Sequence, residues 1–279
     1  DSNDSTNVMA AALVYARTGE VAYLAKVEKA ITDIVTKNLE SGSRALALGR
    51  ELIGYVLAAD IVQLKTVDEA LDAKWRTKLA YLLTYKTSQA GSLIDCSLDR
   101  PNNWGGHSRA SWLAAALYLG DKAGADKAVA TLRGWMGNWS AYNGFEYGDL
   151  AWQVDKTKPV GILPKGAKLQ NYDVDGGQPE ELRRVAFKIP PGFVVYTWEG
   201  LQGPIAAAEM AHRAGYTDIW DECDKALLRA VQFNYRQGWA AEGDDKWVVP
   251  IINRAYGVNF PVTGGGAGKN VGWSLWTHQ

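Results

Sequence analysis

The chain has 279 residues, of which 47% are hydrophobic and 22% are charged, and its formal net charge at pH 7 is -1. This composition supports one large folded domain over residues 1–279 and excludes disordered and fibrous chains. Because the charges nearly balance and no basic patch stands out, we expect no nucleic-acid partner.

The start of the chain and its few cysteines bear on where the protein works. The chain begins at Asp1, as would a processed secreted or periplasmic protein or a chain trimmed at a domain edge. Cys96 and Cys223 exclude a disulfide framework, and they form either one bridge or two unpaired thiols. No apolar run reaches the ~20 residues that a bilayer span needs. We expect a secreted or periplasmic monomer without a membrane segment.

Helical hairpins recur along the chain. Each consists of an apolar helical pattern, a short polar or glycine break and a second helix. The hairpins cover residues 11–31, 55–75, 114–132 and 206–231. In the second hairpin, Thr66 and Glu69 have the spacing of a capping box that would start its second helix.

The spacing of these hairpins predicts the fold class. The third and fourth hairpins are about twice as far apart as the others, so one hairpin is replaced by another structure. Repeated helical pairs must bury their apolar faces against neighbouring pairs, which stacks them in a curved array. We therefore predict an all-α fold, an incomplete (α/α) toroid.

Two long segments lack a helical period. Residues 137–197 stand where the missing hairpin would be, and we expect short strands near residues 144–154 and 193–198. Residues 237–279 form the second irregular segment, with a mobile glycine-rich loop at 261–270. Loops that gather at one end of a helical array commonly form a cleft, so we expect the site there.

Residues 100–121, RPNNWGGHSRASWLAAALYLGD, have the composition of a site in front of a helix. Asn103 and His107 are polar, while Gly105 and Gly106 let the backbone approach another group closely. The apolar helical pattern begins at Ala110. With only three histidines in the chain, a metal site of several histidines is not expected, and acid–base chemistry by His107 without a metal fits better.

The chain is rich in aromatic residues, with twelve tryptophans and thirteen tyrosines. Many lie in the irregular segments, where flat rings with a polar edge suit the faces of sugars. Packing in the core is the alternative for each ring. The residues that we expect to bind substrate are Asn102, Trp104, Tyr172, Trp198, Gln202 and Trp247.

Residues 173–203 combine Arg183 and Arg184 with Tyr196, which precedes a helix expected to start near Trp198. The planar guanidinium of arginine matches a carboxylate, as an acidic substrate would require. An ordinary ion pair with a neighbouring glutamate is the alternative for each arginine. The same segment begins like a calcium loop, but Leu182 occupies the position of the essential glutamate, so no metal is expected.

Several stretches together resemble the alginate-lyase superfamily of polysaccharide lyases. They are residues 100–121, 173–184, 196–216, 241–247, 256–261 and 268–273. The resemblance implies an α/α-toroid fold and β-elimination on a uronic-acid polymer, with asparagine, histidine, arginine and tyrosine as the working residues. In this chain these are Asn103, His107, Arg183 or Arg184, and Tyr196. In the well-known alginate lyases the histidine directly follows the asparagine pair, whereas WGG intervenes here.

Elimination at a 4-linked uronate removes the C5 proton, which is acidic only when the neighbouring carboxylate is neutralised. Asn103 with one of the two arginines is expected to stabilise the charge that develops there, as an oxyanion hole does. Tyr196 would serve as both base and acid where the proton and leaving group share a face of the sugar, and His107 would be the base where they lie opposite. No cofactor is required.

Two other classes remain open. An inverting glycoside hydrolase on an α/α toroid would need two carboxyl groups about 6.5 to 9.5 Å apart. The candidates are Asp95, Asp99, Glu146, Asp149, Asp244 and Asp245. A non-catalytic protein that binds acidic glycans would keep the tryptophans without needing His107 and Tyr196.

Overall fold

The computed structural model describes residues 4–38, 40–263 and 271–278, and the regular secondary structure of this part of the chain is almost entirely helical. In chain order the helices are α1 (Asp4–Thr18), α2 (Val21–Thr36), α3 (Ala45–Ile61), α4 (Leu64–Val67), α5 (Glu69–Thr84), α6 (Leu93–Asp99), α7 (Asn103–Leu119), α8 (Lys122–Met136), α9 (Pro179–Leu182), α10 (Tyr196–Arg213), α11 (Glu222–Arg236), α12 (Val248–Tyr256) and α13 (Ser274–Thr277). The 3-10 turns are η1 (Ile219–Asp221) and η2 (Gly243–Asp245), and two short strands, β1 (Lys168–Leu169) and β2 (Tyr172–Asp173), pair antiparallel. The predicted all-α fold is confirmed.

The four predicted helical hairpins are present as α1/α2, α3/α5, α7/α8 and α10/α11. Gly120 ends α7 in the left-handed conformation that glycine adopts without a steric cost. The capping box predicted at Thr66 is wrong, because Thr66 lies inside the short helix α4. The side chain of Asp68 caps α5 instead, accepting the N–H of Leu71 at 2.9 Å.

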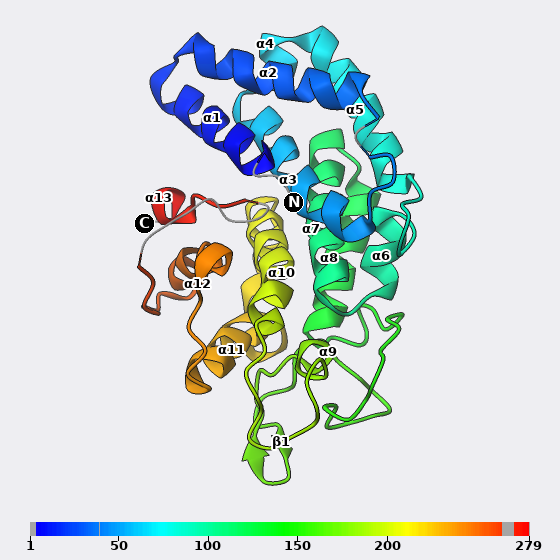
Figure 1. The fold of residues 1–279 in the computed structure, drawn as a ribbon, viewed down its shortest axis with the longest axis vertical. Helices are drawn as coiled ribbons and strands as arrows, with labels where there is room; N and C mark the ends of the chain where they lie inside the picture. Colours follow the sequence, from blue (N-terminus) through cyan, green and yellow to red (C-terminus); the bar gives the residue numbers. More distant parts are fainter. Residues whose placement is uncertain (1–3, 39, 264–270, 279) are drawn as a thin grey trace.

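The helices form two rows that follow the hairpin order (Figure 1). In the inner row α1 contacts α3, α3 contacts α7, α7 contacts α10 and α10 contacts α12. In the outer row α2 contacts α5 and α8 contacts α11. The indole N–H of Trp273 donates to the carbonyl of Thr6 at 2.9 Å, which brings the C-terminal segment back to α1. The array is thus an incomplete toroid whose C-terminal segment returns to the first helix.

Glycines let the three central helices approach closely. A Cβ on Gly203 of α10 would lie 2.3 Å from the backbone of Gly106 in α7. On the other side of α7, a Cβ on Gly49 of α3 would lie 2.9 Å from the backbone nitrogen of Ser108. Because no side chain separates these helices, polar groups on α3, α7 and α10 come within reach of one another.

The irregular segments depart from expectation in detail. No strand forms in residues 144–154 or 193–198, and Tyr196 instead begins α10. Residues 237–279 are not wholly irregular, because 248–256 fold as α12. Most of the predicted glycine-rich loop, residues 264–270, lies outside the described residues. Figure 1 shows α9 and the β1/β2 hairpin beyond the same end of α10.

Two further expectations can be compared with the structure. Both cysteines, the buried Cys96 and the half-buried Cys223, are unpaired, so the alternative of a bridge does not hold. Within the ranges that the structure describes, no helix has the length and apolar character needed to cross a membrane.

Candidate active site

Asn103 is the first residue of α7 and is held by groups from a distant part of the chain. Its side chain is almost fully buried, with 1% of the residue exposed. Its backbone N–H donates to Oε1 of Glu181 at 2.6 Å, and its Oδ1 accepts from Nη2 of Arg184 at 2.9 Å. Asn102 caps the helix, its side chain accepting the N–H of Trp104 at 3.1 Å. The two asparagines therefore differ in role: Asn102 caps α7, and Asn103 belongs to the candidate active site.

Arg184 joins Asn103 to Tyr196. Its Nε donates to Oε2 of Glu181 at 2.6 Å, and its guanidinium carbon lies 4.0 Å from the centroid of the Tyr196 ring. Glu181 is 2% exposed, whereas Tyr196 is 38% exposed. Burial raises the pKa of Glu181, and the charge and hydrogen bond of Arg184 oppose that rise. The buried carboxylate of Glu181 thus holds both the backbone of Asn103 and the guanidinium of Arg184, which lies beside the exposed Tyr196 ring.

Arg183 points to different partners. Its Nε donates to Oε2 of Glu180 at 2.7 Å, and its guanidinium packs against Gly148. Glu180 in turn accepts the N–H of Gly148 at 2.9 Å. Of the two candidate arginines, Arg184 is the one that the structure brings to Asn103 and Tyr196.

His107 belongs to a second cluster across the three central helices. Its Nε2 lies 3.3 Å from Oε1 of Glu199 in α10, and the same carboxylate forms an ion pair with Arg50 of α3. His107 is only 1% exposed. Burial lowers the pKa of Arg50, while the charges of Asp244 and other acidic groups oppose that change. The imidazole therefore faces a buried ion pair rather than open solvent.

The predicted substrate-binding residues divide by exposure. Trp104 is half-buried, with the guanidinium of Arg44 5.9 Å from its ring centroid, next to Asn103 on the chain. Trp198, Gln202 and Trp247 are buried. For the two tryptophans this is the placement that the packing alternative describes, and Gln202 lies in the interior as well.

Two of these residues have specific interior partners, and one lies on the hairpin. The indole of Trp198 donates to the carbonyl of Trp239 at 2.9 Å, and Gln202 donates to Oδ1 of Asp245 at 2.6 Å. Tyr172 lies on β2, where its hydroxyl donates to Gln237 at 2.8 Å. No contact is found between Tyr172 and the cluster at Asn103 among the described residues.

Sequence reasoning missed three residues of these clusters: Arg50, Glu181 and Glu199. Arg50 follows Gly49 in the mainly apolar run ALALGRELIGYVLAADI, and a cation at such a position is a signal that the sequence offers. Glu199 stands inside the YTWEGLQG stretch next to Gly200. Glu181 stands three residues before Arg184, a spacing that by itself indicates only an ordinary ion pair. Paired buried charges are uncommon enough to indicate a specific role.

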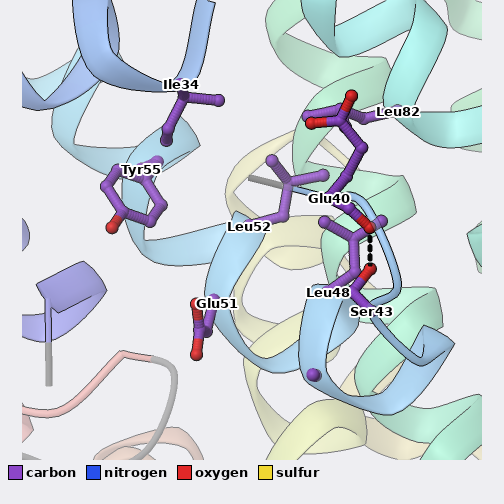
Figure 2. Close-up of a pocket in the computed structure, with 9 residues that line it drawn as sticks. Ile34, Glu40, Ser43, Leu48, Glu51, Leu52, Tyr55 and Leu82 are labelled. Atoms are coloured by element: carbon purple, nitrogen blue, oxygen red, sulfur yellow. Dashed lines mark hydrogen bonds between the residues drawn. The ribbon is translucent and has the colours of Figure 1, made fainter. Parts of the chain in front are cut away.

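A separate cavity of about 100 Å³ lies between α2, α3 and α5 (Figure 2). Ile34, Leu52, Tyr55 and Leu82 give it a largely apolar wall, and Glu40 lies at its edge. None of its lining residues belongs to the clusters around Asn103 and His107. The cavity is therefore distinct from the candidate active site.

No group of three or more histidine, cysteine, aspartate or glutamate side chains in the described residues is arranged to hold a metal ion. A family model described as alginate lyase matches residues 3–247, a range that includes both clusters. Neither the curated proteins nor the solved structures gave a match.

Proposed function

The chain belongs to the alginate lyase family of polysaccharide lyases, and from this we propose that it cleaves a 4-linked uronic-acid polymer by β-elimination without a metal. The observation that carries the proposal is the meeting of Asn103, Arg184 and Tyr196 at one place. These side chains come from α7, from the residues after α9 and from α10. They supply an amide, a cation and a phenol, which are the groups that this reaction requires.

The carboxylate of the bound uronate is the group that Arg184 would hold, with Asn103 accepting from its Nη2 and so orienting it. When the C5 proton leaves, negative charge spreads onto that carboxylate, and preorganised donors stabilise it most at that moment. Glu181 fixes Nε of Arg184, and Asn103 accepts from Nη2, so the guanidinium is held in one orientation before substrate arrives. Preorganisation of this kind costs no rearrangement during the reaction.

Tyr196 is the group best placed to transfer the protons. Its phenol is 38% exposed beside Arg184, whereas His107 is 1% exposed and faces Glu199. A single phenol acts as base at C5 and as acid at O4 when both lie on the same face of the sugar. β-D-Mannuronate and D-glucuronate have that stereochemistry, and L-guluronate does not. We therefore propose polymannuronate or glucuronan as the substrate.

One assay tests the reaction and its stereochemistry together. Elimination leaves an unsaturated uronate that absorbs in the near ultraviolet and consumes no water. We expect absorbance to rise with polymannuronate or glucuronan, not with polyguluronate or a neutral glucan, and to persist after a chelator is added. New reducing ends without absorbance would identify a hydrolase instead, and binding without turnover would identify a sugar-binding protein.

We also propose that the protein is a secreted or periplasmic monomer, since a long polymer substrate is met outside the cytoplasm. The supporting feature is the substrate class of the family alone. Fractionation of the producing cells and light scattering of the purified protein test the two statements separately.

A further inference from the structure

A fully buried arginine on the back of α7 has no carboxylate partner among the residues that the structure describes. Arg109 stands two residues after His107, about 200° around the helix, so its side chain leaves the opposite face from the candidate active site. It is 0% exposed, between α6 and the residues that follow α8. Its Nη2 donates to the carbonyl of Ser97 at 3.2 Å, and its guanidinium carbon lies 5.3 Å from the ring centroid of Phe145.

Unpaired donors collect around this guanidinium. Among the described residues, Nε and Nη1 of Arg109 are buried and have no hydrogen-bond partner. The hydroxyls of Tyr147 and Ser97 are also buried and unpaired among the described residues, whereas the Ser108 hydroxyl interacts with the Cys96 thiol. Ser97 adjoins Arg109 through its hydrogen-bonded carbonyl, and the Tyr147 ring lies 6.1 Å from that of Phe145, the ring that the guanidinium packs against. Since buried polar groups are normally paired, such a concentration indicates a missing partner.

The neighbouring groups do not supply a negative charge. Burial lowers the pKa of Arg109 to about 10, so the guanidinium remains a cation at neutral pH. The titratable groups that act on it are Tyr147, Cys96 and Tyr142, and burial raises the pKa of each, that of Cys96 to about 11. All three are neutral at pH 7. No ion pair joins Arg109 to a carboxylate within the described ranges.

We infer that a small monovalent anion of the size of chloride binds in the interior against Arg109, with the Tyr147 and Ser97 hydroxyls as further donors. A buried charge without a counter-charge is costly, and removing the partner of a buried ion strongly destabilises a fold. A water molecule would fill hydrogen-bonding positions but leave the charge uncompensated. Tyr147 is only partly buried as a residue, although its hydroxyl is buried.

Thermal unfolding of the full chain tests the site, with sodium chloride replaced by sodium gluconate at constant ionic strength. A ligand that binds only the folded state raises Tm with its concentration. We expect chloride at ~100 mM to raise Tm by about 2 °C or more over gluconate. In crystals grown with bromide, we expect an anomalous peak beside Arg109. Equal Tm values in the two salts, or ordered water without a bromide peak, would overturn the inference.

Two phenol variants make a matched pair. Tyr147→Phe removes an unpaired donor and should reduce the chloride-dependent rise in Tm. Tyr142→Phe removes a hydroxyl that already donates to the carbonyl of Leu98 at 2.8 Å, so the rise should persist. An equal rise in both variants would also overturn the inference. Arg109→Met, if it folds, should show no rise. These measurements use no lyase substrate, so their outcome is separate from that of the proposed function.

Discussion

Tyr196 is exposed to solvent and its ring contacts the guanidinium of Arg184 in the candidate active site. It is therefore the most direct residue to test. Tyr196→Phe keeps the ring beside Arg184 and removes the hydroxyl that would carry the proton. Since a positioned acid or base typically contributes 10²- to 10⁴-fold, we expect kcat to fall about 10²-fold or more. Tm and polymer binding should change little. Initial rates from the absorbance of unsaturated products measure the effect.

Tyr172→Phe is the control for the tyrosine experiment. This variant also removes one phenol hydroxyl, but from the β1/β2 hairpin, where the hydroxyl donates to Gln237. We expect it to retain most of the activity. A Tyr196→Phe enzyme as active as the Tyr172→Phe enzyme would show that another group transfers the proton, and His107 would be the next candidate.

Two adjacent glutamates allow a comparison within one helical turn. Glu181 and Glu180 are both buried, and each accepts the Nε of an arginine three residues later. Only Glu181 also holds the backbone of Asn103. We expect Glu181→Gln to lower kcat at least tenfold more than Glu180→Gln, because a neutral amide has one acceptor oxygen for two donors and loses the charge. Values of kcat and KM for both variants measure the difference.

The glutamate pair also shows what the sequence can predict of the site. The resemblance identified Asn103, His107 and Tyr196, but left Arg183 and Arg184 equivalent, because both have a glutamate three residues earlier. The choice depends on how α9 is rotated against the start of α7, and that rotation is a tertiary feature. If Glu180→Gln proved the more damaging variant, the assignment of Arg184 would be wrong.

Among the secondary-structure elements, the close approach of α7 and α10 is what brings the clusters together. Gly203→Ala would place a Cβ 2.3 Å from the backbone of Gly106, so the helices would have to separate. We expect a loss of about 1 to 3 kcal/mol in the free energy of unfolding, as for other overpacked interiors. Urea unfolding measures it. Gly192→Ala is the control, because its Cβ would meet no atom closer than 4.0 Å, and an equal loss there would contradict the packing argument.

Element prediction succeeded where periodicity was strong and failed where tertiary contacts decide. The four hairpins were predicted because apolar residues recur at helical spacing on both sides of each break. FVVYTW was predicted as a strand from its β-branched and aromatic residues, yet Tyr196 begins α10. Trp198 from the same stretch packs inside against Trp239 and Tyr235, and that burial favours the helix over local propensity.

For the whole molecule, the curved row of helices could be predicted and its closing contact could not. The repeated hairpins, together with the family resemblance, indicate an incomplete toroid. The C-terminal residues have no such period, so nothing in the sequence predicts that Trp273 bonds the backbone of Thr6. Nor does it predict that His278 lies 3.3 Å from Glu209 of α10. These two contacts join the C-terminal segment to α1 and to α10.

The His278 contact gives a prediction for stability as a function of pH. Burial alone would raise the pKa of Glu209, but the charge of His278 and the hydrogen bond and charge of Arg213 outweigh it and hold the pKa at about 2, below the ordinary 4.5. Because the folded pKa is the lower one, the unfolded chain takes up the proton first as the pH falls. The ionised Glu209 therefore stabilises the fold fully above about pH 5, and this stabilisation is lost as the pH falls toward 2.

Glu209→Gln should therefore destabilise the protein most at pH 7 and progressively less as the pH falls, with the difference reduced but not abolished near pH 3. Since the Glu209 carboxylate is partly exposed and solvent screens it, we expect the variant to lose about 1 kcal/mol in the free energy of unfolding at pH 7. Urea unfolding of both proteins at several pH values between 3 and 7 measures the difference. His278→Ala should reproduce part of the loss, because it removes the C-terminal partner but leaves Arg213. A difference that stays constant with pH would mean that Glu209 acts through packing rather than through its charge.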